Sequence, residues 1–213
     1  MKLKVYETFY SLQGESTLAG FPSFFVRLGG CNLHCAYCDT PEARSGGYET
    51  GVEDIFLSLG NFPGVHHVTV TGGEPLIQEG ACPLMKALAA RGYTVQLETN
   101  GSILLDRVPK GVRKIVDVKT PSSGEEGSFL MENLGHVGPS DEIKFVISHQ
   151  EDYRFAVDFI KKHLEKTGAV INFSPVWGAM DMTALANRIL DDDLRVRLNT
   201  QLHRILWPGG ERG

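Results

Sequence analysis

Six short apolar segments recur along the chain, and polar segments rich in glycine or proline follow them. They span residues 22–28, 65–70, 93–97, 114–118, 142–147 and 170–173. A loosely alternating segment over residues 3–12 predicts a further strand before them. Apolar residues at helical spacing predict helices over 52–59, 82–91, 151–165 and 182–190. Strands separated by helices or long crossovers favour a parallel sheet with covered faces. Because a closed barrel of this kind needs eight strands, the sequence predicts an α/β fold, a partial (β/α)6-type TIM-like barrel.

Length and composition narrow the class of protein further. A chain of 213 residues with 42% hydrophobic and 22% charged residues is typical of one globular domain, here expected to span 1–213. A net charge of -5 without a basic stripe argues against nucleic acid as the main partner. Neither a signal-peptide core nor a segment long enough to cross a bilayer is visible, so we expect a cytoplasmic protein without a membrane partner.

Three of the four cysteines fall within one loop after the apolar segment at residues 22–28. Cys31, Cys35 and Cys38 have the spacing C-x3-C-x2-C, and Cys82 stands alone. Thiolates are the usual ligands of iron-sulfur clusters, and three of them leave one iron of a 4Fe-4S cluster open to another ligand. A structural zinc site normally takes four protein ligands. The spacing therefore favours an open cluster, with a zinc site or packed thiols as the alternatives.

Polar residues at strand ends are candidates for binding. Thr71-Gly72-Gly73-Glu74-Pro75 follows one strand and Glu98-Thr99-Asn100 ends the next, where α/β sheets place ligands, although either segment could be only a turn. Gln13 and Glu15 are two residues apart, so in an extended segment their side chains point the same way. Arg27 lies in an apolar strand and needs an anion, either Glu7 or Glu15 or a carboxylate of a substrate.

The cysteine loop, with Tyr37 before its last cysteine, resembles the radical S-adenosylmethionine superfamily, and Gly72-Gly73-Glu74-Pro75 matches that superfamily's GGEP motif. The resemblance implies a 4Fe-4S cluster on the three cysteines, with S-adenosylmethionine on the open iron as the source of a 5'-deoxyadenosyl radical. It implies that the Glu74 carboxylate receives the ammonium group of this cofactor. The implied cofactor-binding residues are Tyr37, Gly72, Gly73, Glu74, Glu98, Thr99, Asn100, Ser122, Lys144 and Ser174.

Three further segments resemble the 7-carboxy-7-deazaguanine synthase family, namely Ser11 to Glu15, Cys38-Asp39-Thr40 and Gln201-Leu202-His203 near Trp207. That family converts 6-carboxy-5,6,7,8-tetrahydropterin to 7-carboxy-7-deazaguanine with loss of ammonia, a carbon-nitrogen lyase reaction on the path to queuosine. The resemblance implies a Mg2+ ion held by Thr40, an external electron donor such as a flavodoxin, and a homodimer. The implied substrate-binding residues are Leu12, Gln13, Gly14, Glu15, Arg27, Thr71, Gln201 and His203.

Two departures from the family pattern and two rival functions accompany this interpretation. Ser16 stands where the family often has glycine, and the chain runs on past Trp207, so a C-terminal substrate contact cannot be assigned to a residue. A glycyl-radical-enzyme activating enzyme shares the cluster and cofactor but acts on a protein. A non-catalytic iron-sulfur carrier or zinc-binding adaptor is the alternative from another class, although a carrier normally has four cysteine ligands per cluster.

Overall fold

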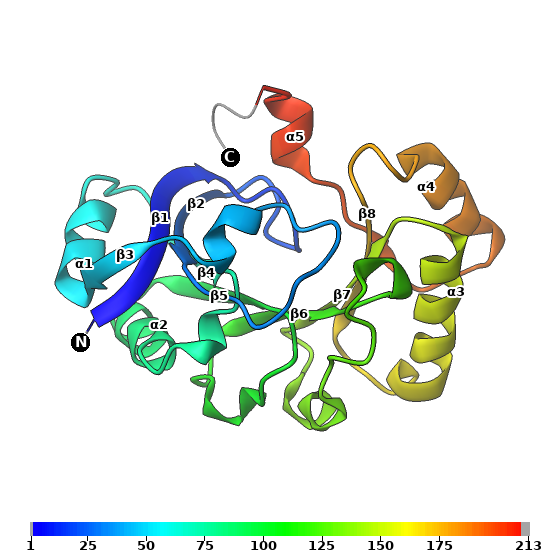
Figure 1. The fold of residues 1–213 in the computed structure, drawn as a ribbon, viewed down its shortest axis with the longest axis horizontal. Coiled ribbons are helices and arrows are strands. Elements are labelled where there is room, and N and C mark those ends of the chain that lie inside the picture. Colours follow the sequence, from blue (N-terminus) through cyan, green and yellow to red (C-terminus); the bar gives the residue numbers. More distant parts are fainter. Residues whose placement is uncertain (1, 210–213) are drawn as a thin grey trace.

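A curved sheet of nine strands organises the computed structural model, which describes residues 2–209 (Figure 1). The strand order is β3-β1-β2-β4-β5-β6-β7-β8-β9, so the described sheet ends at β3 and β9 and does not close. The six predicted parallel strands are confirmed as β2 (Pro22–Leu28), β4 (His67–Gly72), β5 (Thr94–Thr99), β6 (Arg113–Val118), β7 (Glu142–Ile147) and β8 (Val170–Pro175). The partial barrel is therefore confirmed.

The remaining strands extend the two edges of this parallel set. β1 (Lys2–Leu12) runs antiparallel to β2 and to the short β3 (Tyr48–Gly51), whereas β9 (Arg197–Leu198) is a two-residue strand parallel to β8. The sequence predicted β1 but neither of the two short strands.

Four predicted helices are present as α1 (Val52–Gly60), α2 (Ala81–Ala90), α3 (Gln150–Phe159) and α4 (Met182–Asp191). The helix expected over 151–165 continues beyond α3 as a π-helical turn, Ile160–Leu164. A fifth helix, α5 (Leu202–Leu206), was not predicted. No helix within residues 2–209 is long and apolar enough to cross a membrane.

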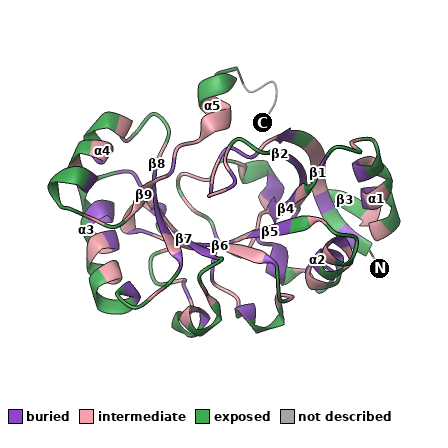
Figure 2. Cartoon of the chain, turned by 180° about the vertical axis from the view of Figure 1, so that it is seen from behind, coloured by how far each residue is buried: buried purple, intermediate pink, exposed green. Residues whose placement is uncertain are grey.

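Side chains alternate between the two faces of the parallel strands, and the two faces differ in polarity. Val70, Leu97 and Phe145 belong to a buried apolar cluster that the strands share with the helices. The cluster includes Leu84, Met85 and Leu88 of α2, Tyr153 and Ala156 of α3, and Leu185 and Ile189 of α4. Figure 2 shows buried residues running along the strands, whereas the helices carry both buried and exposed residues. The hydrophobic core therefore lies between the sheet and its helices.

The residues directly beside those core residues in the sequence point to the opposite face. Thr71, Glu98 and Lys144 alternate with the apolar set, and all three line a cavity enclosed by the curved sheet. The apolar alternate residues thus fix the register of each strand, and this register places polar side chains on the inner face.

The segment that follows β4 packs closely on the entrance to the cysteine loop. Gly73 N–H donates to Leu28 C=O at 3.0 Å, and Glu74 N–H donates to Gly30 C=O at 2.8 Å. A Cβ atom on Gly73 would lie 2.0 Å from the Gly30 carbonyl oxygen and 2.8 Å from Cys31 Cβ. Only glycine fits at this position, so Gly73 allows the two segments to pack closely.

We predict that Gly73→Ala lowers the free energy of unfolding by about 1–3 kcal/mol, because the added methyl group must displace the Gly30 backbone. Urea unfolding of the metal-free protein, followed by circular dichroism, measures the loss. Gly64→Ala is the matched control, since a Cβ atom on this exposed glycine has no neighbour within 4 Å. Equal stability of the two variants would contradict the close approach.

Candidate active site

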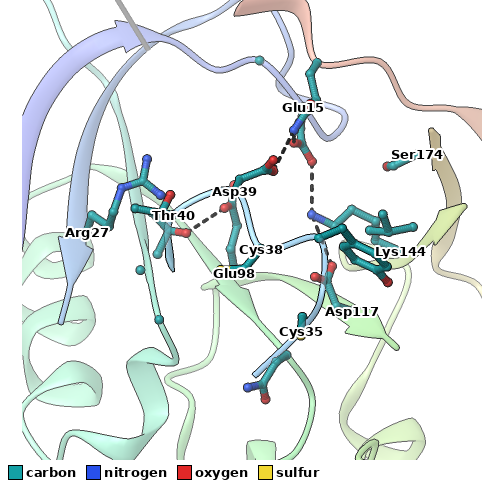
Figure 3. A pocket seen from close by; sticks show the side chains of 18 of the residues that line it. Glu15, Arg27, Cys35, Cys38, Asp39, Thr40, Glu98, Asp117, Lys144 and Ser174 are labelled. Carbon is teal, nitrogen blue, oxygen red and sulfur yellow. Dashed lines mark hydrogen bonds and ion pairs between the residues drawn. The ribbon is translucent and has the colours of Figure 1, made fainter. Parts of the chain in front are cut away.

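A cavity of about 500 Å³ opens where the parallel strands end, and this volume lies within the usual range for small-molecule sites. Cys31, Cys35 and Cys38 form part of its wall, and the inward-facing residues of β4 to β8 form another part. Figure 3 shows Glu15, Arg27 and Lys144 converging on this space from different strands and loops. The cysteine loop and the polar inner face of the sheet therefore share one cavity.

The cysteine loop is held by backbone and side-chain contacts on two sides. Ala36 N–H donates to Ser123 C=O at 2.9 Å, and the Arg44 guanidinium donates to Cys35 C=O at 2.8 Å. The Tyr37 hydroxyl lies 3.2 Å from Thr120 Oγ1. These contacts hold the loop in place. Its three cysteines form no disulfide and remain free thiols.

The chemistry of the three cysteines suits a cluster with an open iron. No group of three His, Cys, Asp or Glu side chains in the described chain gathers as the ligands of one metal ion would. Zinc draws its thiolates to about 2.3 Å around one centre, whereas a 4Fe-4S cluster spreads them over separate irons. Cys31, Cys35 and Cys38 are partly accessible on one cavity wall, which suits a cluster with one iron open to that cavity.

Most of the predicted cofactor-binding residues lie in the cavity wall. Those present are Tyr37, Gly72, Gly73, Glu98, Thr99, Asn100, Lys144 and Ser174. The structure does not place the other two, Glu74 and Ser122, in that wall. Ser122 instead faces the start of α3, where its N–H donates to Asp152 Oδ1 at 2.8 Å.

Glu74 is fully buried, and its carboxylate binds protein donors. It accepts hydrogen bonds from Thr99 Oγ1 at 2.9 Å, Asn100 N–H at 2.7 Å and Leu76 N–H at 3.0 Å. Burial raises the pKa of Glu74, and these donors oppose that rise. A carboxylate offers about four acceptor positions, and protein donors already occupy most of those of Glu74. The hydrogen bond from an ammonium group to Glu74 stays a prediction.

The predicted N-terminal turn folds inward from the hairpin of β1 and β2. Gln13 is buried, donates from Nε2 to Thr69 Oγ1 at 3.1 Å and accepts Glu15 N–H at 3.1 Å. Ser16 follows with φ of 64°, a left-handed conformation that few side-chain-bearing residues adopt. This tight turn directs the Glu15 carboxylate into the cavity, which Gln13 also lines.

A chain of alternating charges crosses the floor of the cavity. Lys144 Nζ lies 3.1 Å from Glu15 Oε2 and 3.2 Å from Asp117 Oδ1 (Figure 3). Lys119 Nζ lies 2.8 Å from Asp117 Oδ2. Burial opposes ionisation of Glu15 and Asp117, but the ammonium groups outweigh it and hold both carboxyl pKa values below their ordinary range. Burial likewise opposes the Lys144 charge, yet Asp117, Glu15 and Glu98 raise the pKa of Lys144 well above normal.

Glu98 differs from the other two carboxyl groups in the direction of its pKa shift. Thr71 Oγ1 donates to Glu98 Oε2 at 2.8 Å, and the amides of Gln13 and Gln96 lie 3.4 Å from Oε1. Burial raises the pKa of Glu98; Lys144 opposes the rise and the Glu15 charge adds to it. The pKa of Glu98 is therefore shifted upward, whereas the pKa of Glu15 is shifted downward.

Arg27 has the protein partner that was one of its predicted alternatives. Its Nε donates to Glu7 Oε1 at 2.7 Å, and its guanidinium carbon lies 5.5 Å from the centre of the Phe9 ring. The two terminal nitrogens of Arg27 have no hydrogen-bond partner among residues 2–209, and the side chain lines the cavity. The guanidinium can therefore bind a second anion there.

The segment containing α5 covers the mouth of the cavity. Gln201 Nε2 donates to Glu15 Oε1 and to Asp39 Oδ2, both at 3.0 Å, and Arg204 donates to Asp39 Oδ1 at 2.9 Å. His203 packs so tightly on Gly14 that a Cβ atom there would lie 2.0 Å from His203 Nδ1. Gln201 and His203 thus join the predicted N-terminal turn, while the final residues 210–213 lie outside the described chain.

The remaining predicted substrate-binding residues, Leu12 and Thr71, also line the cavity, as does Thr40. Sequence reasoning missed Asp117 and Lys119, which lie in and just after β6 and line the same cavity. Charged residues within an apolar strand were the signal that identified Arg27, and the same signal applies to Asp117.

We predict that Lys144→Met destabilises the protein by about 3–5 kcal/mol near pH 8, because buried carboxylates lose their shared cation. In the wild type the pKa of Glu15 is lowered, so its contribution to stability is present above about pH 4 and is lost as the pH falls through the folded pKa. In the variant burial dominates and raises this pKa above the unfolded value, so stability recovers on acidification.

Urea unfolding of the metal-free protein at pH 8 and pH 5 tests this prediction. The deficit of Lys144→Met against wild type is expected to shrink at the lower pH, whereas the exposed-site control Lys162→Met shows little deficit at either. A deficit that stays the same at both pH values would contradict the assignment of Lys144 as the shared cation.

Comparison with known proteins agrees with the geometry. Residues 25–123 match the radical SAM superfamily. The chain is 43% identical to the 7-carboxy-7-deazaguanine synthase of Koribacter versatilis, covering 99% of this chain and 100% of that protein, and 40% identical to that of Chlorobaculum tepidum, covering 99% and 97%. The crystal structure of QueE from Escherichia coli superposes with a TM-score of 0.79 at 25% identity over 94% of each chain. The chain therefore belongs to the 7-carboxy-7-deazaguanine synthase family within the radical SAM superfamily.

Proposed function

We propose that this protein converts 6-carboxy-5,6,7,8-tetrahydropterin to 7-carboxy-7-deazaguanine with loss of ammonia, a carbon-nitrogen lyase reaction that serves queuosine and related deazapurines. The observation that carries the proposal is one cavity walled on one side by Cys31, Cys35 and Cys38 and on the other by polar groups suited to a small polar acid. The full-length similarity to named synthases supports the same reaction.

The cysteine wall would hold the redox cofactor. A 4Fe-4S cluster on the three thiolates, with S-adenosylmethionine on its open iron, supplies a 5'-deoxyadenosyl radical. Gly72 and Gly73 bring backbone to the cavity edge beside Cys31, and Thr99 and Asn100 follow at the end of the next strand. These groups are the proposed contacts to the amino acid part and the ribose of the cofactor, with Ser174 on the adenine side.

The opposite side of the cavity would hold the pterin. Arg27 offers two guanidinium nitrogens that no residue of the described chain engages, and its planar fork suits the substrate carboxylate. Gln13 and Glu15 present an amide and a carboxylate to the ring, and Gln201 and His203 cover it from the C-terminal segment. These contacts hold the ring against the radical source and exclude water.

Thr40 is the proposed protein ligand of Mg2+. It lines the cavity directly after the cysteine loop, and its hydroxyl makes no hydrogen bond within the described chain. One hydroxyl suits a hard cation that keeps most of its shell for water and a substrate carboxylate. The neighbouring Asp39 is instead bound to Gln201 and Arg204.

Loss of ammonia requires that a proton reach the departing nitrogen. Glu98 lines the cavity, and burial raises the pKa of its carboxyl group, which makes Glu98 the proposed proton donor. The Glu15 carboxylate, with its lowered pKa, stays ionised and can accept hydrogen bonds from ring N–H groups. The two carboxyl groups thus divide proton donation and substrate orientation between them.

The proposal extends to the cellular setting. A thiol-ligated cluster suits the reducing cytoplasm, and cluster reduction needs an external electron donor such as a flavodoxin. A homodimer is proposed from the family resemblance alone.

The deciding experiment is an anaerobic turnover assay of the reconstituted protein with S-adenosylmethionine, Mg2+, a reductant and 6-carboxytetrahydropterin. Mass spectrometry is expected to detect 7-carboxy-7-deazaguanine. Cleavage of the cofactor to 5'-deoxyadenosine without this product would reject the substrate and favour the activating-enzyme alternative.

Two variants serve as controls in this assay. Cys35→Ala is expected to lose both the cluster and all cofactor cleavage, because Cys35 is one of three ligands. Thr40→Val keeps the cluster but is expected to form less product at limiting Mg2+, because the hydroxyl ligand is lost. Normal product formation by Thr40→Val at every Mg2+ concentration would show that Thr40 does not hold the ion.

A further inference from the structure

Ser16 combines an unfavourable backbone conformation with complete burial. Its φ is 64° and its relative exposure is 1%, whereas an exposed glycine would adopt this turn without strain. The backbone N–H of Ser16 donates to Asn199 Oδ1 at 2.9 Å, which glycine could do equally well. The side chain therefore needs a separate explanation.

The Ser16 hydroxyl is bonded on both sides. It accepts Leu18 N–H at 3.1 Å and donates to Gln96 Oε1 at 3.0 Å. Because a backbone N–H can only donate, the hydroxyl hydrogen remains available for the Gln96 oxygen. Ser16 thus binds the oxygen end of the buried Gln96 amide.

The orientation of this amide decides what faces Glu98. With its oxygen on Ser16, Gln96 turns its Nε2 toward Glu98 Oε1, at 3.4 Å. The reversed amide would place an acceptor oxygen against the carboxylate oxygen. Ser16 is therefore two hydrogen bonds away from a carboxyl group in the wall of the cavity.

Charged and polar groups of several neighbouring elements also face Glu98. Lys144 of β7 and Arg27 of β2 are positive, and Glu15 of the N-terminal turn is negative. Thr71 of β4 and Gln13 donate hydrogen bonds to the carboxylate. None of these groups contacts the oxygen of the Gln96 amide. Ser16 therefore acts on Glu98 through Gln96 and separately from these groups.

We propose that Ser16 is a positioning residue for Glu98, because its hydroxyl orients the Gln96 amide so that an N–H donor faces the carboxyl group in the cavity. This inference deepens the proposed function, since it assigns a group that sets the protonation of Glu98 during turnover. It concerns the folded chain itself, and its first test needs neither cofactor nor substrate.

The test is an NMR titration of Glu98 in the metal-free protein labelled with 13C at glutamate carboxyl groups, with Glu98→Gln to assign the resonance. Ser16→Gly removes the hydroxyl and the backbone strain, whereas Ser16→Ala removes the hydroxyl alone. Loss of a donor to the charged form raises a pKa. Both variants are therefore expected to raise the pKa of Glu98 by about 0.5–1 unit.

Gln96→Met completes a double-mutant cycle, because it removes the amide while nearly conserving volume. It is expected to give the same upward shift, and Ser16→Gly combined with Gln96→Met no further shift. In the holoenzyme, any limb of the pH-rate profile governed by Glu98 should move in the same direction.

An unchanged Glu98 pKa in folded Ser16→Gly would overturn the proposal and leave Ser16 a purely structural residue, whether or not Ser16→Ala folds. Additive shifts in the double variant would also overturn it, since Ser16 and Gln96 would then act separately. A shifted pKa in a protein that makes no deazaguanine would support the positioning role and reject the proposed function, so the two failures are distinguishable.

Discussion

The ammonium group of Lys144 is the charge on which the floor of the cavity depends. Glu15 reaches it from the N-terminal turn and Asp117 from β6, at 3.1 Å and 3.2 Å. Gln201 then ties the C-terminal segment to the same Glu15 carboxylate. Without that cation, burial would drive the carboxyl groups toward their neutral forms or the segments apart. One buried side chain therefore holds together parts of the chain that are distant in sequence.

The polarity of the sheet explains why the charges and the cysteines share one space. Apolar residues of each parallel strand face the helices, so the alternate residues face inward and are free to be polar. The hairpin loop after β1 reaches across the cavity to the segment after β9, where Ser16 N–H bonds Asn199 and Gly14 C=O accepts Leu202 N–H. This loop and the C-terminal segment close what the sheet leaves open.

The six parallel strands and four helices were predictable because each has a local apolar pattern that the core requires. The contacts between residues of the site were less predictable. Glu15 and Lys144 are separated by 129 positions, and their contact arises from the curvature of the sheet, which no local pattern encodes. The two-residue β9 and the exposed α5 bury too little apolar surface to leave a signal. For Glu74 the motif was recognised from the sequence. The motif did not indicate that the Glu74 carboxylate binds Thr99 and Asn100 within the protein.

We propose that Cys31, Cys35 and Cys38 hold a cluster with one iron open to the cavity. Electron paramagnetic resonance of the reduced, reconstituted protein, recorded with and without S-adenosylmethionine, tests it most directly. We expect the spectrum of a reduced 4Fe-4S cluster whose g values change when the cofactor binds the open iron. A spectrum that the cofactor leaves unchanged, or a protein that retains zinc and no sulfide, would contradict it.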